Sequence, residues 1–427
     1  MKYYMLFLSF FVSCINLSKE KDISSKDLIL KNIDLINGIK NSVSVLNLSD
    51  VSENIDIVKL ELTEQSLLGD IENVFITNND IFIVDYKNGI LRFSKEGIFL
   101  NRIGRKGQGP SEYLSIPQMI VNEKLSLVYL LTTRGLKVFD YDGKYIKTIP
   151  NTLFEDLFFS PNGRILFTGE KFFLNNQLPI LFPNKELWTL ALVDTSLSVV
   201  KKFFNPSFRF YENEIRERAG SGNSLVRDQW TEQTKTHIDF YNDDFRMIYY
   251  GGDTIYQYIK NSFSPCYILD LGERPSFEMS HEWLKKVEFF SYLWLYDFYD
   301  TKDFFYFVLG KSKNLYTVKY GKKDGELQSL NSKSQIIEMK NPAFIHRRFK
   351  YMFELHNDLI GGEFKVDYKT NKYWCDIIYP SDLLKYYNIE DIRNENVKMK
   401  TSRDDYIKML MDVKEEDNPI LLIATLK

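Results

Sequence analysis

The sequence predicts an all-β fold, and within that class a β-propeller of four-stranded antiparallel blades. Aromatic residues make up 15% of the chain, and residues of this kind favour strands. Short apolar runs alternate with turns rich in Asn and Gly, as in antiparallel meanders. Phe82 and Tyr129, 47 residues apart, hold equivalent places in two successive units. This spacing is close to the repeat length of propeller blades.

The first unit covers residues 71–104 and has three polar turns, the last two of which contain Gly89 and Gly97. These turns separate four predicted strands, at 73–77, 81–85, 90–94 and 98–103. The same pattern recurs at 116–150, 245–272, 304–330 and 351–362. A four-stranded meander cannot bury both of its faces alone, so radial stacking of several units is expected.

Strands from the two ends of the domain are expected to pair and so close the ring. Residues 56–62 form a lone strand before the first unit, and residues 418–427 form another at the end of the chain. Pairing of these strands in one blade would close the propeller. A few peripheral helices are also predicted, at 275–290, 380–394 and 402–417, with Ser276 and Ser402 as N-caps. Residues 205–235 are polar and are expected to be an insertion.

Charge and cysteine content exclude two classes of protein. The net charge of −3 argues against nucleic-acid binding, which requires a basic surface. The three cysteines, Cys14, Cys266 and Cys375, form no C-x-x-C pair, which argues against a zinc site. Cys266 and Cys375 are expected to be buried thiols, and a disulfide between them stays open.

The N-terminus has the pattern of a lipoprotein signal. Lys2 precedes an apolar run from Met5 to Val12, which is too short to span a membrane. A small residue, Ser13, then precedes Cys14, as in a bacterial lipobox. We therefore predict a signal peptide at 1–13, lipidation of Cys14, a flexible tether at 14–54 and the propeller at 55–427. An ordinary signal peptide with an incidental cysteine is the alternative.

This N-terminal pattern also predicts the location of the protein. The lipid is predicted to attach the protein to a membrane. The predicted location is therefore the cell envelope, where the protein would be an outer-membrane lipoprotein that faces the periplasm or the cell surface.

The segment "IGRKGQGPSEY" at 103–113 raises the question of a ligand loop. A nucleotide-binding P-loop would place Lys and Ser/Thr after its last glycine, and Pro110 lacks the N–H that an anion nest needs. The segment is therefore expected to be a junction between blades. A ligand-facing loop is the other interpretation, with contacts from Arg105, Gln108, Glu112 and Tyr113.

No catalytic motif is apparent, and no cofactor is predicted. The sequence contains neither H-E-x-x-H nor G-x-S-x-G. A metal in the central channel would need several converging oxygen ligands, for which Asp85, Asp140 and Asp253 are candidates. Aromatic platforms for a ligand could come from Trp230, Trp283, Trp294 and Trp374.

Four motifs resemble those of the six-bladed β-propeller lipoproteins of Bacteroides and related bacteria. They are "GRKGQGPSEY" at 104–113, "GGDTIYQY" at 251–258, "CYILDLGERP" at 266–275 and "KEEDNPILLIATLK" at 414–427, and they occur in the order expected for that family. The resemblance implies six blades, whereas the repeats alone would also permit seven. It implies no particular chemistry.

These observations together predict a lipid-anchored propeller that binds a glycan, peptide or protein partner without catalysis. A hydrolase or lyase with a metal site in the central channel is the alternative. A third possibility is docking to an outer-membrane complex, which an exposed apolar patch would favour.

Overall fold

The computed structural model describes residues 30–427, apart from 115–117, 133–134, 151–164, 169–170, 176–187, 197, 207–235, 243, 250, 275–290, 313, 334–352 and 387. The predicted signal peptide, Cys14, nearly all of the predicted insertion and the helix predicted at 275–290 lie outside the described residues. Among the helices that are described, none is long and apolar enough to cross a membrane.

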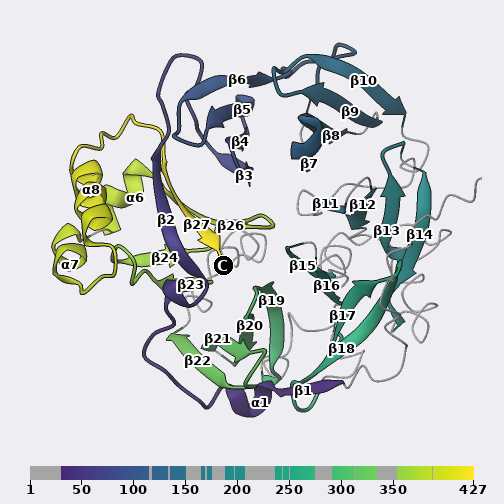
Figure 1. Cartoon of the computed structure of the whole chain (residues 1–427), viewed down its shortest axis with the longest axis vertical. Helices are drawn as coiled ribbons and strands as arrows, with labels where there is room; N and C mark the ends of the chain where they lie inside the picture. Colours follow the sequence, from purple (N-terminus) through teal and green to yellow (C-terminus); the bar gives the residue numbers. More distant parts are fainter. Residues whose placement is uncertain are drawn as a thin grey trace, which may run out of the picture.

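Five four-stranded sheets are arranged as a propeller (Figure 1). A further sheet contains the antiparallel strands β15–β18 and, on its outer edge, the parallel strand β1. The first sheet contains β3 (Ile71–Ile76), β4 (Asp80–Asp85), β5 (Gly89–Ser94) and β6 (Phe99–Ile103). The second contains β7 (Gln118–Asn122), β8 (Leu127–Thr132), β9 (Gly135–Asp140) and β10 (Tyr145–Pro150), with the 3-10 helix η2 (Glu123–Leu125) between β7 and β8.

The remaining sheets follow in chain order. The third contains β11 (Ile165–Thr168), β12 (Lys171–Asn175), β13 (Trp188–Asp194) and β14 (Val199–Phe204). The fourth contains β15 (His237–Tyr241), β16 (Asp244–Ile248), β17 (Thr254–Ile259), β18 (Ser262–Asp270) and β1 (Lys31–Asp34). The fifth contains β19 (Trp294–Asp300), β20 (Phe304–Lys311), β21 (Asn314–Gly321) and β22 (Leu327–Lys333). The closing sheet contains β25 (Tyr368–Lys369), β26 (Tyr373–Ile378), β27 (Ile420–Leu426) and β2 (Ser52–Lys59).

The predicted strands of the first unit are confirmed. Gly89 and Gly97 adopt φ values of +84° and +90°, which L side chains rarely tolerate, so glycine fixes both turns. Phe82 and Tyr129 are each the third residue of the second strand of their sheets, as the repeat predicts.

The predicted pairing of the terminal strands is also confirmed. β2 is antiparallel to β27, with Ile57 opposite Leu422. The outermost strand of the closing sheet thus comes from the N-terminal part of the chain, while its other three strands come from the C-terminal part. β2 begins at Ser52, four residues before the predicted strand.

Residues 30–51 form what we call the N-terminal strap. β1 lies parallel to β18, and further along the strap the Val43 N–H donates to Ser329 O of β22 at 2.8 Å. Leu35, Leu46 and Leu48 are almost fully buried. The flexible tether predicted for 14–54 is therefore wrong from residue 30 onward. These apolar residues are too sparse to form a periodic pattern, and they are buried only because the strap crosses sheets that are distant in sequence.

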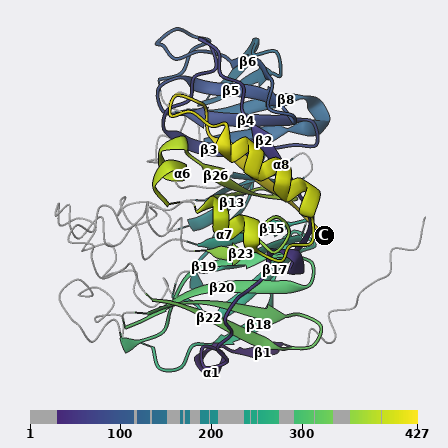
Figure 2. The same ribbon diagram turned by 90° about the vertical axis from the view of Figure 1, so that its left-hand side faces the viewer.

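Helices lie at the outer edge of the closing sheet (Figure 2). α6 (Pro380–Tyr386) and α7 (Ile389–Asn394) confirm the helical prediction for 380–394. α8 (Lys400–Met411) begins before the predicted cap, because Met399 and not Ser402 is its N-cap residue. The short helices α1 (Leu35–Gly38) and η1 (Leu48–Asp50) belong to the strap.

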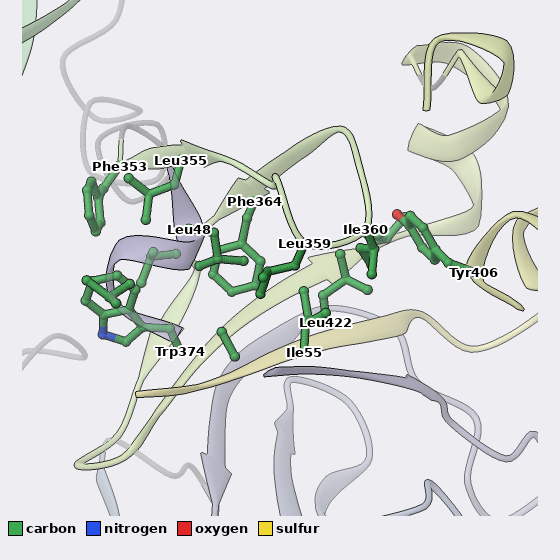
Figure 3. Packing of buried hydrophobic residues seen from close by; sticks show 14 of the residues in the cluster. Leu48, Ile55, Phe353, Leu355, Leu359, Ile360, Phe364, Trp374, Tyr406 and Leu422 are labelled. Atoms are coloured by element: carbon green, nitrogen blue, oxygen red, sulfur yellow. The ribbon is translucent and has the colours of Figure 1, made fainter. Parts of the chain in front are cut away.

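A large apolar cluster joins these peripheral elements to the closing sheet (Figure 3). Leu48 of the strap, Phe364 of the hairpin β23 (Glu354–His356)–β24 (Glu363–Lys365) and Tyr406 of α8 all bury their side chains in it. Trp374, predicted as a possible ligand platform, is 1% exposed and belongs to the same cluster. Because the side chain is buried in this cluster, Trp374 is a core residue and not an exposed platform for a ligand.

The antiparallel meander gives the ring two distinct faces. We call the face where the innermost strands β3, β7, β11, β15 and β19 begin the top face, and the face where they end the bottom face. The connection from each sheet to the next begins and ends on the top face, whereas the turn after each innermost strand lies on the bottom face.

Candidate functional site

The junction loop, residues 103–113, connects β6 to β7 on the top face and closes on itself. The N–H of Gly107 donates to Tyr113 O at 3.1 Å, and the N–H of Tyr113 donates to Arg105 O at 3.2 Å. The loop therefore has a defined conformation, and the prediction of a junction between two sheets is confirmed.

Glu112 organises the inside of this loop. Its carboxylate accepts a hydrogen bond from the Gly109 N–H at 2.9 Å and pairs with Arg105 Nε at 2.6 Å. The hydrogen bond from Gly109 is the main reason why the pKa of Glu112 lies below its usual range, with a smaller contribution from Arg105. A Cβ at Gly107 would overlap with the Glu112 carboxylate, so a larger residue there would displace this side chain from its present position.

Tyr113 packs between the first and second sheets. Its hydroxyl group accepts from the Ile90 N–H at 3.2 Å and donates to Ile103 O at 2.9 Å, and its ring stands edge-on to Phe139. Burial raises the pKa of Tyr113 to about 12. Of the four predicted ligand contacts, Arg105 and Gln108 are exposed and Glu112 is partly exposed, whereas Tyr113 is interior.

A cluster of buried charges lies toward the bottom face, where the fourth, fifth and closing sheets meet. Asp300 at the end of β19 pairs with Arg246 of β16 and with Lys322. Asp239 of β15 accepts from the Asp300 N–H at 2.6 Å and pairs with Lys369 of β25 at 3.0 Å. All five side chains are mostly buried. We call this set the axial charge cluster.

The axial charge cluster is largely neutralised internally. Burial raises the pKa of Asp300, and Lys322 and Arg246 act against that rise. Burial also lowers the pKa of Lys322, which Asp300 opposes. Lys369 Nζ in addition donates to Phe298 O at 3.0 Å and lies 4.1 Å from the centre of the Tyr299 ring. The cluster therefore joins three sheets through contacts among its own side chains and the neighbouring backbone.

Further hydrogen bonds link the turns of the bottom face. Tyr373 Oη donates to Asn78 Oδ1 at 3.2 Å, and the Asn78 N–H donates to Glu123 Oε1 at 3.0 Å. This series runs from the closing sheet through the first sheet to the second. The Asn242 N–H donates to Asn371 Oδ1, which connects the turns of the fourth and closing sheets.

A cleft on the top face lies between the fourth and fifth sheets. It is a shallow cleft: the empty space of about 230 Å³ is mostly open to solvent, and the enclosed part has room for about one water molecule. Residues at the starts of β15 and β19, the turn before β17 and the residue after Glu273 line it: His237, Tyr249, Gly251, Gly252, Arg274, Trp294 and Leu295.

The polar groups of this cleft are held in place by the surrounding backbone and side chains. Arg274 Nη2 donates to the carbonyl oxygens of Gly251 and Gly252, both at 2.9 Å. His237 Nδ1 lies 3.9 Å from Asp297 Oδ1. The lining of the cleft thus combines the aromatic side chains of Tyr249 and Trp294 with the guanidinium group of Arg274 and the imidazole group of His237. Because the cleft is shallow, these groups would contact the surface of a bound partner rather than enclose a small ligand.

Other predicted site residues have structural roles where they are described. Asp85 accepts from the backbone N–H groups of Gly69, Lys87 and Asn88, so it fixes turns. Asp140 accepts from the Lys144 N–H, and Asp253 accepts from the Thr254 hydroxyl. Within the described ranges no group of three or more His, Cys, Asp or Glu side chains could hold a metal ion.

Cys266 and Cys375 are buried free thiols, so the open question of a disulfide is answered in favour of the thiols. Trp294 is largely buried at the edge of the cleft, and Trp230 and Trp283 lie outside the described residues.

Sequence reasoning missed both the axial charge cluster and most of the cleft. The five charged residues of the cluster are spread from position 239 to 369. No spacing rule links them, because the ring brings them together. For the cleft, the motif "GGDTIYQY" was a usable signal, since Gly251 and Gly252 form part of its wall.

The fold places this chain in the β-propeller class, and comparison with known proteins supports that. The chain belongs to the family described as a domain of unknown function (DUF4934), which matches residues 30–425. A crystal structure of a Bacteroides fragilis protein whose name describes it as exported is similar, with a TM-score of 0.60 and 16% identity. That similarity covers 93% of this chain and 99% of the other. It shows a shared fold.

Two other solved structures are less similar. The extracellular domain of a one-component system of Bacteroides thetaiotaomicron has a TM-score of 0.34 and 13% identity, over 65% of this chain and 29% of the other. A Bacteroides fragilis protein named for 6-phosphogluconolactonase has a TM-score of 0.31 and 13% identity, over 72% and 80%. Neither similarity is high enough to carry an argument. No curated protein matches the sequence.

Proposed function

We propose that this protein is a non-enzymatic binding module of the cell envelope, anchored by a lipid on Cys14, and that its top face binds a glycan, peptide or protein partner. The observation that carries the proposal is the difference between the two faces. Hydrogen bonds between turns and the Asp239–Lys369 ion pair join neighbouring sheets toward the bottom face, whereas the described cleft opens between the fourth and fifth sheets on the top face.

The architecture of this module is a six-bladed ring. The five four-stranded sheets and the five-stranded fourth sheet supply the six blades. Contacts between neighbouring innermost strands, such as β15 with β19 and β25 with β3, support a closed ring.

An extracytoplasmic location is supported by the similar Bacteroides fragilis protein, whose name describes it as exported. The lipobox and the family resemblance favour an outer-membrane lipoprotein. Labelling with a palmitate analogue tests the anchor: we expect incorporation that is lost in Cys14→Ser, and undiminished labelling of that variant would contradict it.

The binding proposal is tested with arrays of envelope glycans and peptidoglycan-derived peptides, followed by titration of each positive probe. We expect Trp294→Ala to weaken binding at least tenfold, because it removes part of the cleft wall. Tyr373→Phe, on the bottom face, is the matched control and should bind normally. Loss of binding in Tyr373→Phe with normal binding in Trp294→Ala would refute the assignment of the face.

The alternative of a hydrolase or lyase with a channel metal has no specific observation in its favour. Turnover of a positive ester or glycan probe, abolished by a chelator, would establish that alternative and overturn the non-enzymatic proposal.

A further inference from the structure

Two buried aspartates lie opposite each other where the innermost strand of the closing sheet begins. Asp367, directly before β25, is 7% exposed, and Asp376 of β26 is 1% exposed. β25 is antiparallel to β26, with Tyr368 opposite Cys375. The Asp367 N–H donates to Cys375 O at 3.0 Å, so the pairing continues by one residue and sets Asp367 against Asp376. We call these two residues the aspartate pair.

Crossed hydrogen bonds bring the two carboxyl groups of the aspartate pair together. Asp367 Oδ2 accepts from the Ile377 N–H at 3.0 Å, and Asp376 Oδ2 accepts from the Lys365 N–H at 3.0 Å. In the antiparallel register, Ile377 and Lys365 both lie on the β24 side of the pair. The two side chains therefore extend in the same direction along the sheet, each toward the backbone of the opposite segment, and their carboxyl groups lie side by side.

The surroundings of the aspartate pair oppose two negative charges. Like charges directly opposite each other on a sheet are destabilising, and two carboxyl groups that share a buried site retain one proton between them. Burial, and then the Asp367 carboxylate, raises the pKa of Asp376 well above its ordinary value. Lys365 of β24 acts against this rise, whereas Glu354 of β23 adds to it. Burial and Glu363 in turn raise the pKa of Glu354.

We propose that the aspartate pair shares one proton, in a hydrogen bond from the Asp376 carboxyl group to the Asp367 carboxylate, and that this bond is a pH-sensitive latch between the hairpin β23–β24 and the closing sheet. The hairpin buries Leu355 and Phe364 against that sheet (Figure 3). When the shared proton is lost to solvent, two adjacent buried negative charges repel each other. The segment 363–369 should then loosen from β26 first, while the other sheets of the ring stay folded.

Urea unfolding of the full chain as a function of pH tests the shared proton. As the pH rises above about 4, the free energy of unfolding should decline, and Asp376→Asn should reduce the slope by about one proton. Asp367→Asn should reduce it equally, because the new amide can donate to the remaining carboxylate, which then needs no proton. The double variant should show no further reduction. Glu363→Gln, at an exposed carboxyl group of β24, is the matched control and should keep the parent slope.

A parent slope in Asp367→Asn would overturn the proposal, because it would mean that burial alone keeps the proton on Asp376. This comparison decides the question even if Asp376→Asn does not fold. Hydrogen exchange, corrected for its intrinsic pH dependence, tests the latch: residues 363–378 should lose protection as the pH rises, and residues 80–94 of the first sheet should not. Equal protection of both segments throughout would contradict the latch. Neither test involves a ligand, so both are independent of the function proposed for the top face.

Discussion

Tyr113 shows how one residue can be a strong marker of the fold without contacting a ligand. Its hydroxyl group bridges the backbones of β5 and β6, and its ring lies against Phe139 of the next sheet. The sequence singled out the loop correctly but could not separate its exposed residues from its interior one. Burial of a tyrosine depends on the neighbouring sheet, which local spacing does not reveal.

Tyr113→Phe should lower the free energy of unfolding by about 1–3 kcal/mol, because a buried N–H of Ile90 and a buried carbonyl of Ile103 lose their partner. Urea unfolding measures the change. Tyr86→Phe is the control, and since Tyr86 is exposed its effect should stay within about 0.5 kcal/mol. Equal effects of the two changes would show that the Tyr113 hydroxyl group is not engaged as described.

The buried carboxyl group of Asp376 in β26 is expected to make the free energy of unfolding depend on pH. It is 1% exposed, and its Oδ2 accepts from the Lys365 N–H at 3.0 Å. Burial, and then the nearby carboxylate of Asp367, raises the pKa of Asp376 well above 3.8. Lys365 acts against this rise, while Glu354, whose own pKa is raised by burial, adds to it.

In the folded state, Asp376 therefore stays protonated at pH values at which the same carboxyl group in the unfolded chain has already lost its proton. The stability contributed by this proton is complete below pH 3.8 and is lost as the pH rises toward the folded pKa. Asp376→Asn should flatten the decline of the unfolding free energy as the pH rises above about 4. Asp412→Asn, at an exposed carboxyl group, should leave the decline unchanged. A wild-type slope in Asp376→Asn would contradict the assignment.

At the scale of elements, the axial charge cluster connects the fourth, fifth and closing sheets, which the repeat pattern predicts only as separate units. Asp300→Asn would leave Arg246 and Lys322 buried without their carboxylate. We expect a loss of about 3–5 kcal/mol in the free energy of unfolding, measured by urea denaturation. Asp244→Asn, at a side chain that is 53% exposed, should cost less than about 1 kcal/mol. A loss below about 1 kcal/mol for Asp300→Asn would show that the cluster does not couple the sheets.

The N-terminal strap is the element that the sequence did not reveal. Leu48 of η1 is fully buried in the cluster around the closing sheet, whereas Val45 is 38% exposed. Leu48→Ala should therefore destabilise the protein by about 2–5 kcal/mol, and Val45→Ala should have little effect in the same thermal or urea unfolding experiment. Similar small effects of both changes would mean that the strap is a loose tether after all.

For the whole molecule, turn chemistry and repeat spacing were enough to predict the strands of the first two sheets and the pairing of β2 with β27. The strands follow from local turns that contain glycine, and the pairing of β2 with β27 follows from the need to close the ring. The described parts of the site were not predictable in this way. The cleft residues range from His237 to Leu295, and the axial charge cluster extends from Asp239 to Lys369. Only closure of the ring brings such distant residues together.

The difference between the two faces is the central claim, and photo-crosslinking in intact cells tests it most directly. A photoreactive phenylalanine would replace Glu273, which is exposed beside Arg274 at the top-face cleft, or Asp142, whose side chain is 93% exposed in a bottom-face turn. We expect adducts with a molecule other than the protein itself from position 273 and none from position 142. Adducts from position 142 alone would contradict the account.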